Sequence, residues 1–194
     1  MIEVYSQNLD GVWFSVACAK QQIIASSFGQ NQQVTLSNIL RNIPFDSPFE
    51  VFHGSSVFAE AILSFLKSIY DGKDVDGCFL LDLKRLPVYT QKTLKATAKI
   101  PLGYVASYGS IAKAVGGGPR AVGNVMASNP FAPIIPCHRV VKSDFTLGGY
   151  GGGLTVKLEL LSREKRGFTS PKEVELNGRT LQVFPVEYSL GSFA

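Results

Sequence analysis

Residues 130–141 read PFAPIIPCHRVV, and the rest of the chain is best understood from this stretch outward. The run is apolar, contains three prolines and ends on Cys137, which a histidine and an arginine directly follow. A cysteine among apolar residues alone would indicate an inert, buried thiol. Basic groups beside it favour the thiolate, which is the nucleophilic form of the side chain. Cys137 is therefore the first candidate for a catalytic residue.

The size and composition of the chain indicate an ordinary globular protein. Its 194 residues suit one large domain or two small ones, and 45% hydrophobic with 18% charged residues is typical of a folded core. The first 20 residues lack a charged start followed by an apolar block, and no apolar run reaches the roughly 18 residues of a membrane helix. We therefore expect neither a signal peptide nor contact with a membrane.

Cysteine and histidine usage indicates a reducing compartment and argues against a metal site. The three cysteines, Cys18, Cys78 and Cys137, are widely separated, and an odd number does not fit a disulfide framework. The chain has two histidines, and the only close pair of the two residue types is Cys137 with His138, so no zinc site is expected. We expect a cytoplasmic protein in which Cys18 and Cys78 are structural.

The net charge of +4 hides a strong asymmetry along the chain. The rest of the chain carries ten cations and fifteen anions, whereas the span between Asp82 and Asp144 contains no aspartate or glutamate. An acid-free basic block suits a polyanionic partner, above all nucleic acid, and a solvated basic face is the alternative. The nine cations of this span are Lys84, Arg85, Lys92, Lys95, Lys99, Lys113, Arg120, Arg139 and Lys142.

The first 85 residues show the pattern of a small domain that mixes strands and helices. Asp10-Gly11 between apolar runs is a hairpin signal. Ser55 and Ser56 precede apolar residues at helical spacing, which predicts a capped helix that stops at Asp71-Gly72. The expected strands are residues 2–6, 12–19, 23–28 and 79–83, the expected helices are residues 34–40 and 57–69, and a domain boundary is expected near Leu86-Pro87.

The basic block that follows contains the pattern of a helix-turn-helix. Residues 88–99 are a helical candidate that stops before Pro101, because the residue before a proline disfavours the helical conformation. Residues 107–115 and 119–127 then form two short helical segments on either side of three glycines, and the second opens with a proline. The same pattern also occurs as a plain packing unit of two helices.

The second of these segments is unusual for a helix that reads bases. Ala121, Gly123 and Ala127 are small, and Arg120 is the one long cation. Few side chains there could bond to base edges in the major groove. Small residues instead permit close approach to DNA, with Arg120 as a single long probe.

After residue 147 the sequence GGYGGG, residues 148–153, suits neither helix nor strand. Glycine permits a ligand to approach the backbone closely, and Tyr150 could lie against a flat ring. A surface loop is the alternative, and the missing Lys-Ser/Thr argues against a nucleotide-binding loop. Residues 154–165 are expected to be a helix with Glu164 near its end, and Asn177-Gly178 predicts a hairpin in the tail.

Together these residues resemble the O6-alkylguanine-DNA alkyltransferases. The resemblance covers about residues 86–166. It is carried by Pro136-Cys137-His138-Arg139-Val140, Asn129-Pro130, Pro119-Arg120-Ala121-Val122-Gly123, the Tyr150-Gly-Gly-Gly-Leu run and Glu164.

The resemblance implies an α+β fold with two domains. Residues 1–85 would form an N-terminal α/β structural domain with an antiparallel sheet plus helix, ribonuclease-H-like. Residues 86–167 would form a mostly helical domain for DNA binding and alkyl transfer, with a winged-helix-like helix-turn-helix. Residues 168–194 would be a C-terminal extension that can form a β-hairpin.

The reaction that the resemblance implies is direct-reversal DNA repair. The alkyl group of O6-alkylguanine in double-stranded DNA, with O4-alkylthymine as a further substrate, would move irreversibly to Cys137 in a single turnover. A base inside the duplex is inaccessible, so the nucleotide must be flipped out. No cofactor and no metal are implied, double-stranded DNA is the expected partner, and a monomer is the expected state.

The resemblance also implies roles for individual residues. Arg120 would replace the extruded base, and Ala121, Gly123 and Ala127 would contact DNA. Tyr108 would assist extrusion and protonate the leaving guanine. Asn129 would hold the turn before the cysteine. His138, oriented by Glu164, would take the thiol proton of Cys137; on a strand their side chains would point to opposite faces, so a water would bridge them.

The implied substrate pocket is formed by Tyr150, Gly151, Gly152, Met126 and Pro130. The family commonly has a serine that bonds the guanine oxygen at the position of Gly151. Two other classes of protein compete with this interpretation. One is a helix-turn-helix module that binds lesions without catalysis, and the other is a Cys-His-Glu hydrolase, for which adjacent Cys and His would be unusual.

Overall fold

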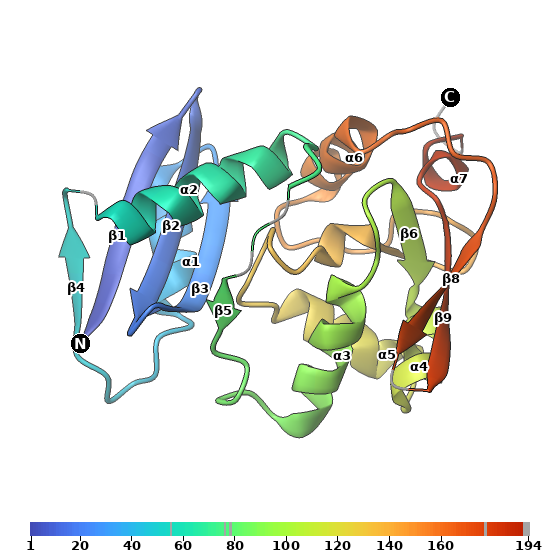
Figure 1. Cartoon of the computed structure of the whole chain (residues 1–194), viewed down its shortest axis with the longest axis horizontal. Helices are drawn as coiled ribbons and strands as arrows, with labels where there is room; N and C mark the ends of the chain where they lie inside the picture. Colours follow the sequence, from blue (N-terminus) through green and yellow to red (C-terminus); the bar gives the residue numbers. More distant parts are fainter. Residues whose placement is uncertain (55, 76, 78, 177, 192–194) are drawn as a thin grey trace. The chain divides into compact units, whose positions relative to one another are not determined.

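The computed structural model describes residues 1–54, 56–75, 77, 79–176 and 178–191, so the expectations for Ser55, Cys78 and Asn177 lie outside the described residues. The fold is α+β, and the chain divides into two compact units (Figure 1). The first unit contains Met1–Arg85 and Pro130–Ile134, and the second contains Leu86–Asn129 and Ile135–Ala194. The short segment Pro130–Ile134 departs from the continuous second domain expected from the sequence.

A five-stranded sheet with the order β4-β1-β2-β3-β5 forms the first unit. The antiparallel meander predicted from the sequence is confirmed, and its first strand extends to Leu9. Strand β4 was not expected, and β5 is shorter than the strand expected at residues 79–83. Strand β4 pairs in parallel with β1, and β5 pairs in parallel with β3. The strands are β1 (Ile2–Leu9), β2 (Val12–Ala19), β3 (Gln22–Gly29), β4 (Phe49–Phe52) and β5 (Leu80–Leu81).

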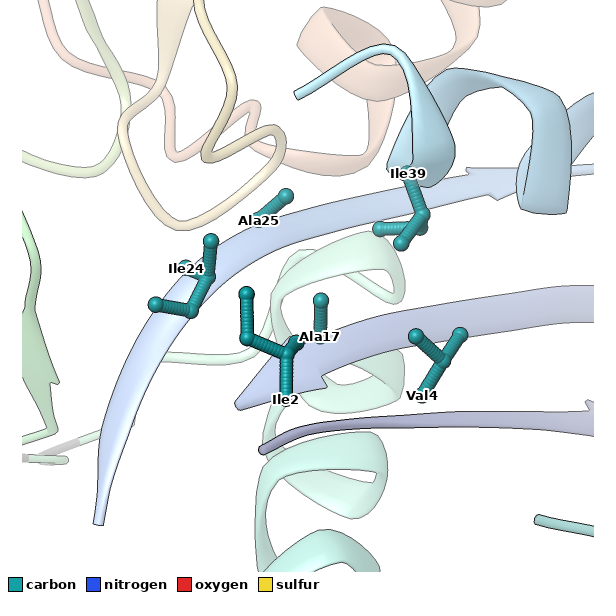
Figure 2. Packing of buried hydrophobic residues seen from close by; sticks show 6 residues of the cluster. All are labelled: Ile2, Val4, Ala17, Ile24, Ala25 and Ile39. Atoms are coloured by element: carbon teal, nitrogen blue, oxygen red, sulfur yellow. The ribbon is translucent and has the colours of Figure 1, made fainter. Parts of the chain in front are cut away.

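Helices α1 (Gln32–Leu40) and α2 (Val57–Tyr70) cover opposite faces of this sheet (Figure 1). Each helix begins where a polar side chain accepts hydrogen bonds from its first turn, Asn31 for α1 and Ser56 for α2. Figure 2 shows Ile39 of α1 above the small and aliphatic side chains of the strands, a cluster formed by Ile2, Val4, Ala17, Ile24, Ala25 and Ile39. Burial of this cluster holds α1 on the sheet.

The apolar part of the central stretch belongs to the first unit. The Ser26 backbone N–H donates to Pro130 O at 2.8 Å, and the Ser26 hydroxyl donates to Ala132 O at 2.9 Å. Phe131 is fully buried, with the Arg85 guanidinium 5.9 Å from the centroid of its ring. These contacts anchor the chain beside β3 a few residues before Cys137.

The second unit combines helices with a sheet. The helices predicted from the sequence are confirmed with end shifts of one or two residues, and a short C-terminal helix was not predicted. The helices are α3 (Val88–Ala98), α4 (Tyr108–Val115), α5 (Pro119–Ala127), α6 (Leu154–Arg163) and α7 (Glu187–Leu190).

A four-stranded sheet accompanies the helices of this unit, and two of its strands lie in the segment expected to be a C-terminal extension. It has the order β7-β6-β9-β8, with β6 (Tyr104–Ser107), β7 (Val140–Val141), β8 (Lys172–Leu176) and β9 (Arg179–Pro185). Strands β8 and β9 form the expected hairpin, and β9 pairs antiparallel with β6. Leu181, Val183 and Val186 are fully buried, and Val186 packs with Val105 and Val141. The C-terminal segment is therefore part of the core of the second unit.

Three glycines separate α4 from α5, and two of them have conformations that favour glycine. Gly116 has φ +92° and Gly117 has φ +85°. A Cβ on Gly117 would lie 2.8 Å from the Tyr89 hydroxyl of α3, so a side chain does not fit there. The turn is therefore fixed by backbone conformation and by close approach to α3.

Replacing Leu181 by alanine tests whether the C-terminal hairpin supports the second unit. We expect the free energy of unfolding to fall by about 2–5 kcal/mol, because a fully buried leucine leaves a cavity. The control is Thr180→Ala, at the exposed neighbouring position of the same strand, with a change within about 0.5 kcal/mol. Equal denaturation curves for the two variants would mean that the hairpin is only loosely attached.

Candidate functional site

Cys137 lies in a single 3₁₀ turn, Cys137–Arg139, which we call the nucleophile turn. Pro136 precedes the turn, and its carbonyl accepts a hydrogen bond from the Arg139 backbone N–H at 2.9 Å. The expectation that Cys137 and His138 lie on a strand, with side chains on opposite faces, is wrong. The chain enters a strand only at Val140, where β7 begins.

The Cys137 thiol is nearly buried, with 7% of the residue exposed. Burial raises the pKa of the thiol, and a hydrogen bond from Asn129 and the charge of Lys157 only partly offset this. The Asn129 amide also donates to Ile135 O at 2.9 Å, which fixes the backbone before the nucleophile turn. Cys137 is therefore a protonated thiol at rest, and the thiolate expected from its basic sequence neighbours does not form spontaneously.

His138 and Glu164 form a buried pair. His138 Nε2 lies 2.8 Å from Glu164 Oε1, and the two side chains are 0% and 1% exposed. Glu164 is the C-cap residue of α6, so this helix brings the carboxylate to the nucleophile turn. His138 Nδ1 has no hydrogen-bond partner among the described residues. With the Nε2 proton directed at the carboxylate, Nδ1 is the nitrogen that can accept a proton.

Arg139 holds the same carboxylate from the other side. Its Nε donates to Glu164 Oε2 at 2.8 Å and its Nη2 to Glu164 Oε1 at 2.9 Å, a bidentate pair. Its Nη1 donates to Ile100 O at 2.7 Å. From the sequence, Arg139 was expected to be a basic neighbour that favours the Cys137 thiolate, and its pairing with Glu164 was not predicted. Its place directly after Cys137 and His138 was the signal that it belongs to the site.

The charges of this group follow from its burial and its contacts. Burial opposes ionisation of Glu164, but His138 and Arg139 outweigh burial and lower the pKa of the carboxyl to about 2. Burial lowers the pKa of His138, against the opposing effect of Glu164. At neutral pH the imidazole is therefore neutral and able to accept a proton, while the carboxylate is ionised.

Tyr108 and the glycine loop, residues 148–153, lie close to this group. Tyr108 opens α4, and its hydroxyl donates to Gly149 O at 3.4 Å. A Cβ on Gly148, which has φ +67°, would lie 3.0 Å from the Tyr108 ring. Burial first and the nearby Cys137 second raise the pKa values of Tyr108 and Tyr150. Both phenols keep their protons at neutral pH and can act as donors.

The remaining residues of the expected pocket differ in their surroundings. Tyr150 is half-buried, and Gly151 and Gly152 are exposed. A Cβ on Gly151 would meet no atom within 4 Å, so the position has room for a serine. Met126 is buried, and its sulfur accepts a weak hydrogen bond from Thr97 at 3.7 Å. Pro130 belongs to the first unit, where it bonds Ser26.

Helix α5 carries the small residues expected to contact DNA. Arg120 and Ala127 are exposed, and Ala121 and Gly123 are half-buried. A Cβ on Gly123 would meet no atom within 4 Å. The exposed side of α5 therefore carries mainly small side chains, and Arg120 near its start is the one long side chain.

No group of three or more His, Cys, Asp or Glu residues in the described part of the chain is placed to hold a metal ion. Among the described helices, none is both long enough and apolar enough to cross a membrane.

Comparison with known proteins relates this site to one family. The family described as "6-O-methylguanine DNA methyltransferase, DNA binding domain" matches residues 88–166. Methylated-DNA–protein-cysteine methyltransferase of Pyrobaculum aerophilum is 58% identical over 65 residues, which are 34% of this chain and 44% of that protein. The protein of the same name from Mycobacterium leprae is 43% identical over 113 residues, which are 57% of this chain and 67% of that protein.

The fold is similar to a solved structure from the same group of proteins. The crystal structure of Mycobacterium tuberculosis OGT in complex with DNA superposes with a TM-score of 0.67 at 28% sequence identity. The match covers 84% of this chain and 92% of that chain. The similarity thus extends over both units, whereas the sequence matches above span about half to two thirds of the relatives' length.

Replacing Glu164 by glutamine removes the charge that His138 and Arg139 share. We expect the free energy of unfolding at pH 7 to fall by roughly 3–5 kcal/mol, as when a buried ion pair loses one partner. The folded-state pKa of about 2 lies below the ordinary 4.5, so this stabilisation is complete above about pH 4.5 and is lost as the pH falls toward 2. Urea unfolding at pH 7 and pH 3 measures both effects.

The matched control is Glu159→Gln on the same helix, where the carboxylate is exposed and 3.7 Å from Arg163. Its removal should change stability by less than about 1 kcal/mol. A Glu164→Gln variant as stable as this control would contradict the charge assignment. So would a variant whose loss in free energy of unfolding, relative to the wild type, is the same at pH 3 as at pH 7.

Proposed function

Because this chain belongs to the methylated-DNA–protein-cysteine methyltransferase family, we propose that it repairs DNA by transferring an alkyl group from O6-alkylguanine to Cys137. The observation that carries this proposal is the nearly buried thiol next to a neutral histidine whose partner is an ionised carboxylate. Such an arrangement supplies a nucleophile and a base.

Activation of the thiol is the first step. His138 Nδ1 takes the Cys137 proton through a bridging water, while Glu164 stabilises the imidazolium that results. The thiolate forms only as this proton leaves, because burial keeps the pKa of Cys137 raised.

The transfer itself is a displacement at the alkyl carbon. A bond forms between the Cys137 sulfur and that carbon, and the bond between the carbon and O6 of guanine breaks with its electron pair staying on the base. Tyr108 donates a proton to the leaving guanine and recovers one as His138 releases the proton that it took. The product is a thioether, so each molecule acts once.

DNA binding is assigned to α4 and α5. Ala121, Gly123 and Ala127 let α5 approach the duplex closely, and Arg120 fills the space of the flipped nucleotide. Tyr108 assists the extrusion, and Tyr150, Gly151, Gly152 and Met126 lie around the extruded base. The chain acts as a monomer, with O4-alkylthymine as a further substrate.

The proposal includes a finer description of the fold. The first unit is ribonuclease-H-like, supported by a three-stranded meander with a parallel strand beside β1. The second unit is winged-helix-like, supported by α4 and α5 followed by the β8–β9 hairpin. Residues 1–85 act as support for the fold.

Intact-protein mass spectrometry tests the proposed reaction. After incubation with a duplex that carries one O6-methylguanine, we expect a gain of one methyl group per protein, located on the Cys137 peptide. Cys137→Ser should gain nothing. Cys18→Ser is the control and should gain one methyl group, as the wild type does. Burial raises the pKa of Cys18 to about 11, so that thiol should stay unmodified. Tight binding of the duplex without a mass gain would favour a lesion-binding module instead.

Arg120→Ala separates DNA handling from chemistry. We expect transfer from the duplex to slow by roughly tenfold or more, in line with about 1–3 kcal/mol for one arginine contact. Transfer from a free O6-alkylguanine base should keep its rate, because no base needs to be extruded. Arg41→Ala, an exposed arginine at the end of α1, is the control. Equal slowing with both substrates would contradict the role assigned to Arg120.

A further inference from the structure

Phe145 has a backbone conformation that residues with a side chain rarely adopt. Its φ is +63°, within the left-handed region that favours glycine. A bulky side chain makes this conformation unfavourable, so it persists only where surrounding contacts hold it. Phe145 lies in residues 142–147, which connect the end of β7 to the glycine loop. A strained residue therefore lies three positions before the first glycine of that loop.

Two other aromatic rings pack against Phe145. Its ring lies edge-on to Phe184, with the ring centroids 5.0 Å apart, and edge-on to Tyr188, with the centroids 5.4 Å apart. The Phe184 and Tyr188 rings also contact each other, with centroids 6.2 Å apart. Edge-to-face pairs at these distances are attractive beyond the apolar area that they bury. We call Phe145, Phe184 and Tyr188 the aromatic trio, and its packing holds the strained backbone in place.

The C-terminal segment supplies two members of the aromatic trio and holds them in fixed positions. Phe184 lies in β9, which pairs with β6, and Tyr188 lies in α7. The Glu187 carboxylate of α7 accepts the backbone N–H groups of Arg166 at 3.2 Å and Gly167 at 2.6 Å. These bonds tie α7 to the chain just after α6. The aromatic trio thus rests on the sheet and on the end of α6.

The segment that carries Phe145 is short and closed by its own hydrogen bonds. The Lys142 N–H donates to Thr146 O at 2.9 Å, and the Phe145 N–H donates to Lys142 O at 3.0 Å. Leu147 is buried in a cluster with residues of β6, β7 and α6, and Phe145 packs against this cluster. Because so short a segment cannot absorb a change of conformation, a change in the backbone at Phe145 moves the start of the glycine loop.

The glycine loop contacts Tyr108 where the loop begins. A Cβ on Gly148 would lie 3.0 Å from the Tyr108 ring, and the Tyr108 hydroxyl donates to Gly149 O at 3.4 Å. The start of the loop therefore lies against the phenol that is proposed to protonate the leaving guanine. The nucleophile turn is held separately, by Glu164 and Asn129. A shift of the loop thus alters the base pocket and leaves the thiol in place.

We propose that Phe145 is a positioning residue for the alkylated base, because the aromatic trio holds the glycine loop at the place where the base binds. This inference rests on the proposed function, in which Tyr150, Gly151 and Gly152 lie around the extruded base. Phe145 acts through the backbone of the loop and not on the reacting atoms. The C-terminal segment, through β9 and α7, thereby takes part in substrate binding.

The test compares two variants of Phe145 in the full chain, with transfer from free O6-methylguanine base followed by intact mass. Phe145→Ala removes the ring but keeps a Cβ, so the backbone leaves the left-handed region and the loop shifts. We expect its second-order rate of transfer to fall about tenfold, which corresponds to the cost of the left-handed conformation. Phe145→Gly also removes the ring, but glycine adopts the same φ without strain, so its rate should stay within about threefold of the wild type.

A second readout separates the glycine loop from the nucleophile turn. Alkylation of Cys137 by iodoacetamide needs no guanine pocket, and its rate depends on the thiolate and its exposure. We expect the wild-type alkylation rate in both variants of Phe145. A role in general packing would instead change transfer and alkylation together.

Tyr188→Ala tests the aromatic trio from its other side. Tyr188 is 39% exposed, so the variant should fold, which circular dichroism checks. We expect transfer to slow by about threefold through the loss of its ring pairs. Tyr188→Phe is the matched control and should transfer at the wild-type rate, because it keeps the ring and loses only the hydroxyl that donates to Thr169 O at 3.1 Å.

Four results would overturn the inference or the function beneath it. A Phe145→Ala variant with the wild-type rate, or a Phe145→Gly variant as slow as Phe145→Ala, would overturn the positioning role. Slower alkylation by iodoacetamide in step with slower transfer would overturn it too. If neither variant of Phe145 folds, a Tyr188→Ala rate equal to that of the wild type overturns it. A wild type that transfers no alkyl group from the free base or from the duplex contradicts the proposed function instead.

Discussion

The structure of the site depends on one buried carboxylate. Glu164 ends α6, and its two oxygens accept hydrogen bonds from His138 and Arg139, which directly follow Cys137. Removing a charge from water is unfavourable, so the carboxylate is stable in this place only with both partners. This requirement ties α6 to the nucleophile turn and sets the tautomer of His138. The chemistry assigned to Cys137 follows from that constraint.

The same constraint explains why the thiol is held protonated. Of the two basic groups nearest to Cys137 in sequence, His138 is neutral and Arg139 is paired with Glu164, so neither supplies a free positive charge for a resting thiolate. Burial then raises the pKa of the thiol. In the proposed single-turnover reaction, a nucleophile that is protonated at rest is protected from oxidation and alkylation until a substrate is bound. Asn129 and Lys157 moderate this protection from two other sides.

Short sequence patterns correctly predicted the turns and helices that form through interactions between residues close together in the chain. The Asp10-Gly11 turn and the helical spacing after Ser56 are such cases. Strands β4 and β7 were missed because strands of four and two residues exist only through their partners. The 3₁₀ turn at Cys137 was predicted to be part of a strand, because apolar and β-branched residues flank it on both sides. The role of Arg139 and the burial of Lys157 were also missed, because a sequence shows a cation but not the carbonyl or carboxylate that folding places beside it.

The protonation of the His138 ring tests the central claim most directly. The chain has two histidines, and His53 is exposed, so nitrogen-15 NMR of labelled protein can distinguish the buried ring. We predict that His138 carries one proton, on Nε2, and that Nδ1 is unprotonated at neutral pH, with Cys137 intact. A proton on Nδ1, or a doubly protonated ring at pH 7, would contradict the account, because no base would then be available for the thiol.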